Sequence, residues 1–149
     1  MDSTKSVTEI KSELRKRYRA EREFLVVESH WKHLLDSREV NAANFVASYC
    51  SYGDEPNTSA LNQSLLEAGK KVLLPRLRED NDLDWVIWSG KEEDLIPRGL
   101  VHEPIGDAYN GEIDVVIVPA LHIDRRGNRL GQGGGSYDRA LARTKAWKV

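Results

Sequence analysis

The sequence predicts an α/β protein in which helices cover both faces of a mostly parallel central sheet, as a three-layer α/β/α sandwich. Helical and strand-like segments alternate along the chain. Ile113–Ala120 consists mainly of β-branched and apolar residues, which is typical of a central parallel strand that is buried on both faces. With 149 residues and 40% apolar side chains, the chain can form one hydrophobic core, so we expect a single domain over residues 1–149.

The first expected element is an amphipathic helix. Ser6 and Glu9 have the spacing of a capping box. Apolar residues then recur at helical intervals, at Ile10, Leu14 and Tyr18. The positions between them are strongly basic, and a solvated basic face is the simplest interpretation of that charge. A second helix is expected over roughly Ser29 to Asn44.

Strands and a further helix follow. Three segments have strand character: Phe45–Ser51, Lys71–Pro75 and Asp84–Trp88. Between the first two, a helix around Leu61 and Leu65 should begin at a cap formed by Asn57 or Thr58 and end at Gly69. The polar stretch Ser89–Gly99 is expected to be a connection.

Near the C-terminus, Arg125–Asn128 predicts a turn, and a short helix is expected over roughly Tyr137–Thr144. Ala146–Val149 then has the character of a beginning strand, and the chain stops there. A parallel sheet would normally continue beyond such a strand. We therefore expect a domain that is truncated at the C-terminus, lacks C-terminal elements and leaves a sheet edge open.

Composition excludes several classes of protein. The formal net charge of −2 gives no general attraction to nucleic acid or to an anionic membrane, so neither partner is expected. Cys50 is the only cysteine, which excludes intramolecular disulfides and thiolate zinc sites. The first residues lack the apolar segment of a signal peptide, and no apolar run is long enough to cross a bilayer. We expect a cytoplasmic monomer.

The strongest functional motif is the glycine-rich segment Arg129–Arg139. Four glycines, Gly131, Gly133, Gly134 and Gly135, permit backbone angles that let several amide groups converge on one point. A helix should begin just after them, which favours phosphate binding. Arg129 and Arg139 can add charge, and Asp138 can hold a Mg²⁺ ion that accompanies a triphosphate. The alternative interpretation is a flexible loop or tight turn.

Other glycine motifs do not match this segment. No Gly-Lys-Ser/Thr of a Walker A loop occurs. Ser136 stands where a dinucleotide fingerprint needs glycine or alanine. It also lacks the glycine two positions later that a nucleophile elbow needs, because Asp138 stands there.

The segment Val118–Arg139 closely resembles the signature of the 5-formyltetrahydrofolate cyclo-ligase family, which runs Val-Pro-Ala and then Asp-x-x-Gly-x-Arg-Leu-Gly-x-Gly-x-Gly-x-Tyr-Asp-Arg. Three further segments resemble the family in the same order: Lys11–Arg15, Glu55–Thr58 and Lys70–Pro75. The resemblance implies a three-layer α/β sandwich. It also implies use of ATP and Mg²⁺ to convert 5-formyltetrahydrofolate, which can carry a polyglutamate tail, to 5,10-methenyltetrahydrofolate through a phosphorylated formyl intermediate.

The resemblance also implies roles for individual residues. ATP would contact Lys11, Arg15, Arg129 and the loop residues Gly131, Gln132, Gly133, Gly134, Gly135, Ser136, Tyr137 and Asp138. The folate would contact Glu55, Cys50 and Tyr137; Arg139 and Tyr137 would be catalytic, and Asp138 would bind the metal. Considered without the family, Glu55 is a turn carboxylate, Tyr137 a core tyrosine and Cys50 a small buried hydrophobe rather than a nucleophile.

Two positions depart from the family pattern, because Gln132 and Ser136 stand where aromatic residues are frequent. Two other functions remain as alternatives: a non-catalytic homologue that binds nucleotide or folate, and a nucleic-acid module that uses the basic first helix. The negative net charge argues against the second.

Overall fold

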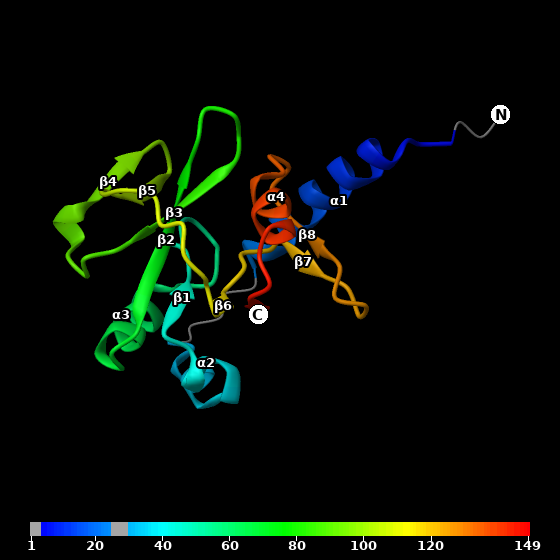
Figure 1. Cartoon of the computed structure of the whole chain (residues 1–149). Helices are drawn as coiled ribbons and strands as arrows, with labels where there is room; N and C mark the ends of the chain where they lie inside the picture. Colours follow the sequence, from blue (N-terminus) through cyan, green and yellow to red (C-terminus); the bar gives the residue numbers. More distant parts are fainter. Residues whose placement is uncertain (1–3, 25–29) are drawn as a thin grey trace.

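The computed structural model describes residues 4–24 and 30–149, which form an α/β fold around a five-stranded sheet (Figure 1). The strand order is β3-β2-β1-β6-β9. The strands are β1 (Phe45–Ala47), β2 (Lys71–Leu77), β3 (Leu83–Ile87), β6 (Val115–Val116) and β9 (Trp147–Lys148). All neighbouring pairs are parallel except β2 with β3. The expectation of a mostly parallel sheet is confirmed.

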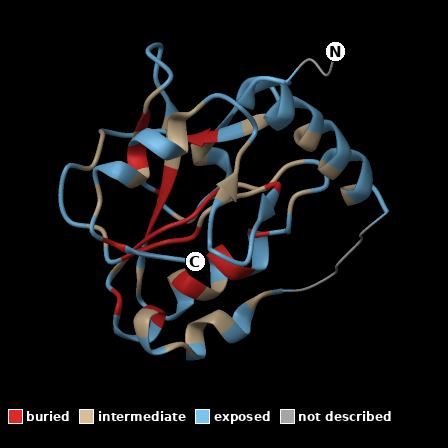
Figure 2. Cartoon of the chain, turned by 90° about the vertical axis from the view of Figure 1, so that its right-hand side faces the viewer, coloured by how far each residue is buried: buried red, intermediate tan, exposed pale blue. Residues whose placement is uncertain are grey.

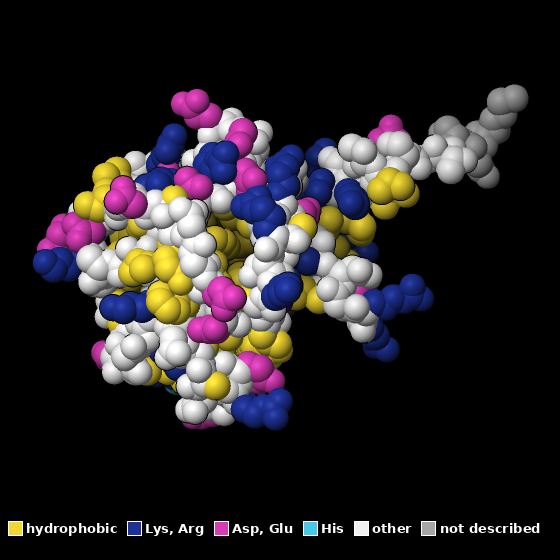
Figure 3. Space-filling model, in the orientation of Figure 1, with side chains coloured by type: hydrophobic (Ala, Val, Ile, Leu, Met, Phe, Trp, Pro, Cys, Tyr) yellow, Lys and Arg dark blue, Asp and Glu magenta, His cyan; other side chains and the backbone are white. Residues whose placement is uncertain are grey.

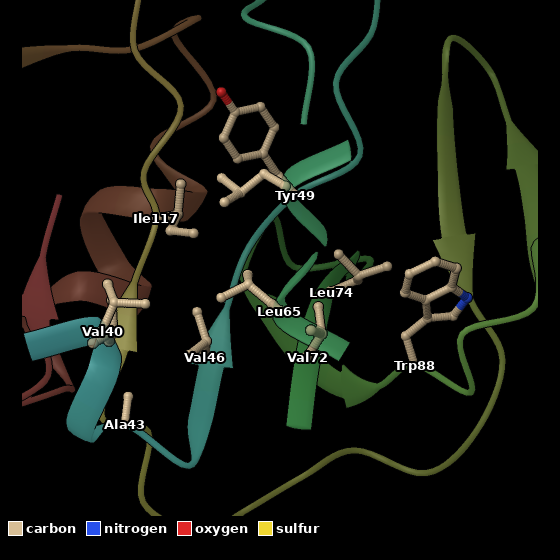
Figure 4. Packing of buried hydrophobic residues seen from close by; sticks show 11 residues of the cluster. Val40, Ala43, Val46, Tyr49, Leu65, Val72, Leu74, Trp88 and Ile117 are labelled. Carbon is tan, nitrogen blue, oxygen red and sulfur yellow. The ribbon is translucent and has the colours of Figure 1, made fainter. Parts of the chain in front are cut away.

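Helices cover both faces of this sheet, as expected. Alternate residues of a strand face opposite sides, so Val46 and Ala47 of β1 belong to different hydrophobic clusters. On one face, α2 (Arg38–Ala42) and α3 (Ser59–Glu67) supply Val40 and Leu65, which pack on the sheet (Figure 4). On the other face, α4 (Ser136–Ala142) supplies Ala140. Buried residues accordingly concentrate along the central strands (Figure 2).

The segment Ile113–Ala120 occupies the expected central position between two parallel neighbours, but only Val115–Val116 forms regular strand. Both valines are almost fully buried. The sheet bonding continues irregularly as far as Val118, whose amide donates to the carbonyl of Val149. Pro119 follows and has no N–H to donate, so the ladder ends where the chain turns toward the glycine-rich segment. The strand expected at Ala146–Val149 is present as β9.

Helix α1 (Val7–Arg22) begins with the expected capping box between Ser6 and Glu9. It extends away from the central sheet (Figure 1), and none of its residues, all of them in the described part of the chain, is buried. Its neighbour is the small antiparallel pair β7 (His122–Ile123) and β8 (Arg129–Leu130), on either side of the expected turn. The helix is therefore held by surface contacts rather than by a core.

The prediction of a single helix from Ser29 to Asn44 is wrong. Ser29 itself lies outside the described residues. The remainder forms a 3₁₀ helix, η1 (Lys32–Asp36), and then the short α2. Ser37 separates them with extended backbone angles, φ −64° and ψ 144°, and its hydroxyl accepts a hydrogen bond from the amide of Val40. A serine that caps a new helix interrupts the old one.

The connection expected at Ser89–Gly99 contains regular structure. It includes a 3₁₀ turn, η2 (Glu92–Asp94), and strand β4 (Leu95–Arg98), which pairs with β5 (Val101–Pro104) as an antiparallel hairpin. Gly99, with φ +64°, occupies the two-residue turn between these strands, where a positive φ favours glycine. Within residues 4–24 and 30–149, no helix is both long and apolar enough to pass through a bilayer.

Candidate functional site

A cavity of about 610 Å³ lies where the glycine-rich segment faces α1 and the ends of β1 and β2. The predicted site residues that line it are Lys11, Arg15, Cys50, Glu55, Arg129, Gly131, Gln132, Gly133, Gly134, Gly135, Ser136, Tyr137 and Asp138. Lysine and arginine side chains gather on the surface where α1 meets the rest of the molecule (Figure 3). The fold thus brings together residues from both ends of the chain.

The glycine-rich segment runs from the end of β8 into α4, and its backbone needs glycine at two positions. Gly133 has φ +111°, and Gly135 has φ +74° at the residue that precedes α4. Residues with a β-carbon rarely adopt such angles. A β-carbon at Gly133 would also lie 3.6 Å from Cζ of Arg15. The bare backbone here leaves a cradle beside a cation, which suits an anionic ligand.

Arg15 and Arg129 hold this segment from two sides. Nε of Arg15 donates to the carbonyl of Gly131 at 2.9 Å. Arg129 donates to the carbonyl of Pro119 at 2.9 Å and to the carboxylate of Asp138 at 3.1 Å. The Arg129 side chain is only 15% exposed, whereas that of Asp138 is 74% exposed. Asp138 can therefore be reached from solvent, while Arg129 is mainly enclosed.

The metal prediction at Asp138 involves a single carboxylate. Among the described residues, no group of three or more His, Cys, Asp or Glu side chains could hold a metal ion. Mg²⁺ commonly takes one or two carboxylates together with the oxygens of a bound polyphosphate. Asp138 is a single exposed carboxylate that already pairs with Arg129, and its role as a metal ligand stays a prediction.

Tyr49, Cys50 and Glu55 also line the cavity, and their side chains act on Tyr137. Burial raises the pKa of Tyr49 to about 12 and that of the Cys50 thiol to about 11, so both are protonated at neutral pH. Burial also raises the pKa of Glu55, against the opposing effect of a hydrogen bond from the amide of Tyr52 at 3.0 Å. The pKa of Tyr137 is raised by burial and by the nearby Glu55.

A hydrogen-bonded loop positions Glu55. Thr58 is the residue before α3, as expected, but its hydroxyl donates inward to the carbonyl of Tyr49 instead of capping the helix. The hydroxyl of Ser51 accepts from the amide of Thr58 at 3.0 Å, and the hydroxyl of Thr58 accepts from the amide of Ser51 at 3.2 Å. These bonds close the loop that contains Glu55. Asn57 provides the local cap through a bond from the amide of Ser59.

Two buried polar atoms of the site have no hydrogen-bond partner within the described part of the chain: the hydroxyl of Tyr137 and Nε of Arg129. Buried polar groups are nearly always paired. The Tyr137 ring packs edge-on against Trp85 and lies under the Arg129 guanidinium, with Cζ 5.6 Å from the ring centre. The ring of Tyr137 is therefore held by two contacts, while its buried hydroxyl remains unpaired.

Arg139 is not among the described residues that line the cavity. Its guanidinium donates to the carbonyls of Gly134 and Asn81, at 3.2 and 3.1 Å. It thus links the glycine-rich segment to Asn81, and its catalytic role stays a prediction.

Sequence reasoning missed two arginines of α1 that it assigned to solvent. Arg19 bonds to Gln132, and Arg22 bonds to the carbonyl of Ala120, which lines the cavity. The charge of Arg22 also acts on Glu55 and Tyr49, whose pKa values it lowers against the larger effect of burial. Arg15, Arg19 and Arg22 are spaced at i, i+4 and i+7. The sequence shows that they share one helical face, but that spacing suits a solvated face equally well.

Comparison with known proteins gives a consistent result. Residues 4–149 match the model of the 5-formyltetrahydrofolate cyclo-ligase family. A 5-formyltetrahydrofolate cyclo-ligase of Mycolicibacterium smegmatis is 40% identical over 104 residues, which cover 64% of this chain and 54% of the relative. A 5-formyltetrahydrofolate cyclo-ligase of Escherichia coli K12 is 35% identical over 113 residues, which cover 72% of this chain and 62% of the relative. The match thus spans less than two thirds of either relative.

A solved structure shares the fold. The NMR structure of Aquifex aeolicus 5,10-methenyltetrahydrofolate synthetase superposes with a TM-score of 0.78 at 30% sequence identity. The superposition covers 94% of this chain and 76% of that protein.

Proposed function

The chain belongs to the 5-formyltetrahydrofolate cyclo-ligase family, and on this premise we propose that it converts 5-formyltetrahydrofolate to 5,10-methenyltetrahydrofolate with ATP and Mg²⁺. ATP would supply the phosphoryl group that activates the formyl oxygen, and Mg²⁺ would balance phosphate charge. The observation that carries the proposal is the pair of unpartnered polar atoms, on Tyr137 and Arg129, beside a glycine cradle.

The phosphate chain fits the part of the cavity next to residues 131–136. Amide groups of this segment, together with Lys11, Arg15 and Arg129, supply hydrogen-bond donors and positive charge. Gln132 and Ser136 add polar side chains, and Asp138 would hold Mg²⁺. Arg139 would act in catalysis through Gly134, whose carbonyl accepts its hydrogen bond.

The folate would lie beside Glu55, Cys50 and Tyr137. Glu55 can accept hydrogen bonds from donors of the pterin, and Cys50 offers an uncharged, half-buried contact. The phenol of Tyr137 is protonated at neutral pH, and burial raises its pKa further, so its hydroxyl can donate a hydrogen bond but cannot act as a base. We propose that this donor orients the formyl group toward the phosphate and so has a catalytic role.

We further propose that the protein acts as a cytoplasmic monomer, without nucleic-acid or membrane partners, on folates that can carry a polyglutamate tail. The net charge of −2 supports the absence of a nucleic-acid partner. Arg78 and Arg98 also line the cavity, where they pair with Asp80 and Glu103, and tail carboxylates would compete with these partners for them.

The test is a direct assay. Protein with ATP, Mg²⁺ and 5-formyltetrahydrofolate should produce the near-ultraviolet absorbance of the methenyl product, and omission of ATP should abolish it. Lys11→Ala and Arg15→Ala should each raise the KM for ATP, while Lys5→Ala, on a lysine that pairs with Glu13, should not. A folded protein that binds ATP and folate but forms no product would instead be a non-catalytic homologue.

A further inference from the structure

The basic face of α1 docks on the segment that forms the cavity. Three arginines spaced at i, i+4 and i+7 each donate to an acceptor between Ala120 and Gln132. Arg15 bonds to the carbonyl of Gly131, Arg19 to Gln132, and Arg22 to the carbonyl of Ala120. From the sequence these arginines look like a solvated face. In the structure their hydrogen bonds are the main polar contacts that attach α1 to the rest of the protein.

Arg19 makes the most extensive of these contacts. Its Nε and one terminal nitrogen donate to the same side-chain oxygen of Gln132, at 3.0 and 2.7 Å. The terminal nitrogen also lies 3.3 Å from the backbone carbonyl of Gln132. One guanidinium therefore holds both the side chain and the main chain of a single residue, 113 positions away in sequence. Charge-assisted bonds of this kind define an orientation as well as a distance.

The bonds from Arg19 can affect the shape of the site because Gln132 lies within the glycine-rich segment. It lies between Gly131, which accepts from Arg15, and Gly133, whose φ is +111°. Fixing residue 132 restricts the peptide groups on both sides of it. In the same contact, Arg19 fixes the helical turn that precedes it, which carries Arg15 into the lining of the cavity.

Besides the three arginine bonds, few contacts hold α1 in place within the described chain. None of its residues is buried: Leu14 and Tyr18 are half-buried, and Val7 and Ile10 are 69% and 44% exposed. The other contact of note is a ring stack between Tyr18 and His122, with centroids 4.2 Å apart and planes 7° from parallel. A helix without a buried face depends on its polar contacts for a defined position.

We propose that Arg19 and Gln132 form a clamp that positions α1 against the glycine-rich segment and so prepares Lys11 and Arg15 for a polyphosphate ligand. Arg19 is a positioning residue, since it acts on the ligand through Gln132 and Arg15. The inference rests on the proposed function for the identity of the ligand, but the clamp itself exists without any ligand.

The kinetic test uses Arg19→Ala and Gln132→Leu. Each should raise the KM for ATP by about tenfold, as expected for losing a charge-assisted hydrogen-bond pair, with kcat and the KM for folate within about twofold. The double variant should be no worse than Arg19→Ala alone, because Gln132→Leu removes only the side-chain acceptor of bonds that Arg19→Ala already removes. Arg17→Ala is the matched control, since Arg17 pairs with Glu21 on the same helix. Fully additive losses, or an unchanged KM for ATP in Arg19→Ala, would overturn the clamp.

A second measurement separates the clamp from the proposed function. Amide hydrogen exchange in the ligand-free protein should be faster across Val7–Arg22 in Arg19→Ala than in the wild type, and unchanged in Arg17→Ala. If the wild type lacks turnover but the exchange result holds, the proposed function fails and the clamp stands. If the wild type is active and exchange is the same in all three proteins, the clamp is wrong. Faster exchange with an unchanged KM for ATP would reject its role in nucleotide binding.

Discussion

The guanidinium of Arg129 lies over the ring of Tyr137, 5.6 Å from its centre, and each of the two residues carries one buried polar atom that finds no partner in the described chain. An unpaired buried donor is unfavourable in the ligand-free protein, by about 1–3 kcal/mol. A ligand that pairs with these atoms recovers that energy. On the proposed function, the ligand would supply these missing partners.

Tyr137→Phe should separate binding from stability. Removing a hydroxyl that has no partner should leave the free energy of unfolding unchanged or raise it by up to about 1 kcal/mol. If the hydroxyl donates to the folate, kcat/KM for methenyl formation should fall by about tenfold or more. Denaturant unfolding without ligand and steady-state kinetics measure the two effects. A variant that is clearly less stable but fully active would reject this role.

Glu55 should make stability fall as pH rises. Burial raises the folded-state pKa above the unfolded value of about 4.3, so its contribution is fully present below that value and is lost as pH rises through the folded pKa. The side chain in Glu55→Gln is uncharged at every pH. The stability of this variant relative to the wild type should therefore increase as pH rises over the same interval. Unfolding free energies of both proteins between pH 4 and 8 test this; parallel curves would contradict it.

Asp82 should have the opposite effect. Its carboxylate pairs with the guanidinium of Arg143 and accepts a hydrogen bond from the amide of Leu83, and both contacts lower its pKa. The resulting stability is present above the unfolded pKa of about 3.9 and disappears as pH falls through the lower folded value. In acid titrations, Asp82→Asn should therefore lose less stability than the wild type. An equal loss in both proteins would show that the ion pair does not contribute.

Gly133 and Gly134 should respond differently to alanine. Gly133 has φ +111°, so alanine there should lower stability by roughly 1–3 kcal/mol and weaken ATP binding. Gly134 has no positive φ, and its added β-carbon meets no atom within 4 Å. Alanine there should be neutral or stabilise by up to about 1 kcal/mol, by restricting the unfolded chain. Thermal unfolding of the two variants gives the comparison, and similar losses in both would contradict the assigned backbone geometry.

Cys50 should behave as a packed thiol. Because burial raises its pKa to about 11, little thiolate exists at pH 8, and alkylation by iodoacetamide should be much slower than for a free cysteine. Cys50→Ala should retain turnover. Rapid alkylation of the native protein, or loss of catalysis in the variant with ATP and folate still bound, would assign the thiol a chemical role instead.

Local patterns in the sequence determined much of this protein. The capping box at Ser6 and Glu9 defines the start of α1 with residues three positions apart, and the β-branched run at Val115 and Val116 marks a buried central strand. The glycine-rich segment also indicates its own backbone geometry, because Gly133 and Gly135 adopt angles that few other residues tolerate. Signals of this kind require no knowledge of distant contacts.

Tertiary structure alone decided the rest. Ser37 and Thr58 can each cap a helix, but only packing determines that Ser37 divides a helix and that the hydroxyl of Thr58 turns inward to Tyr49. The arginines of α1 suit solvent or a docking surface equally well until Gln132, 113 residues from Arg19, lies beside them. A hydrogen bond between residues so far apart depends on closure of the whole fold, and no local pattern encodes that geometry.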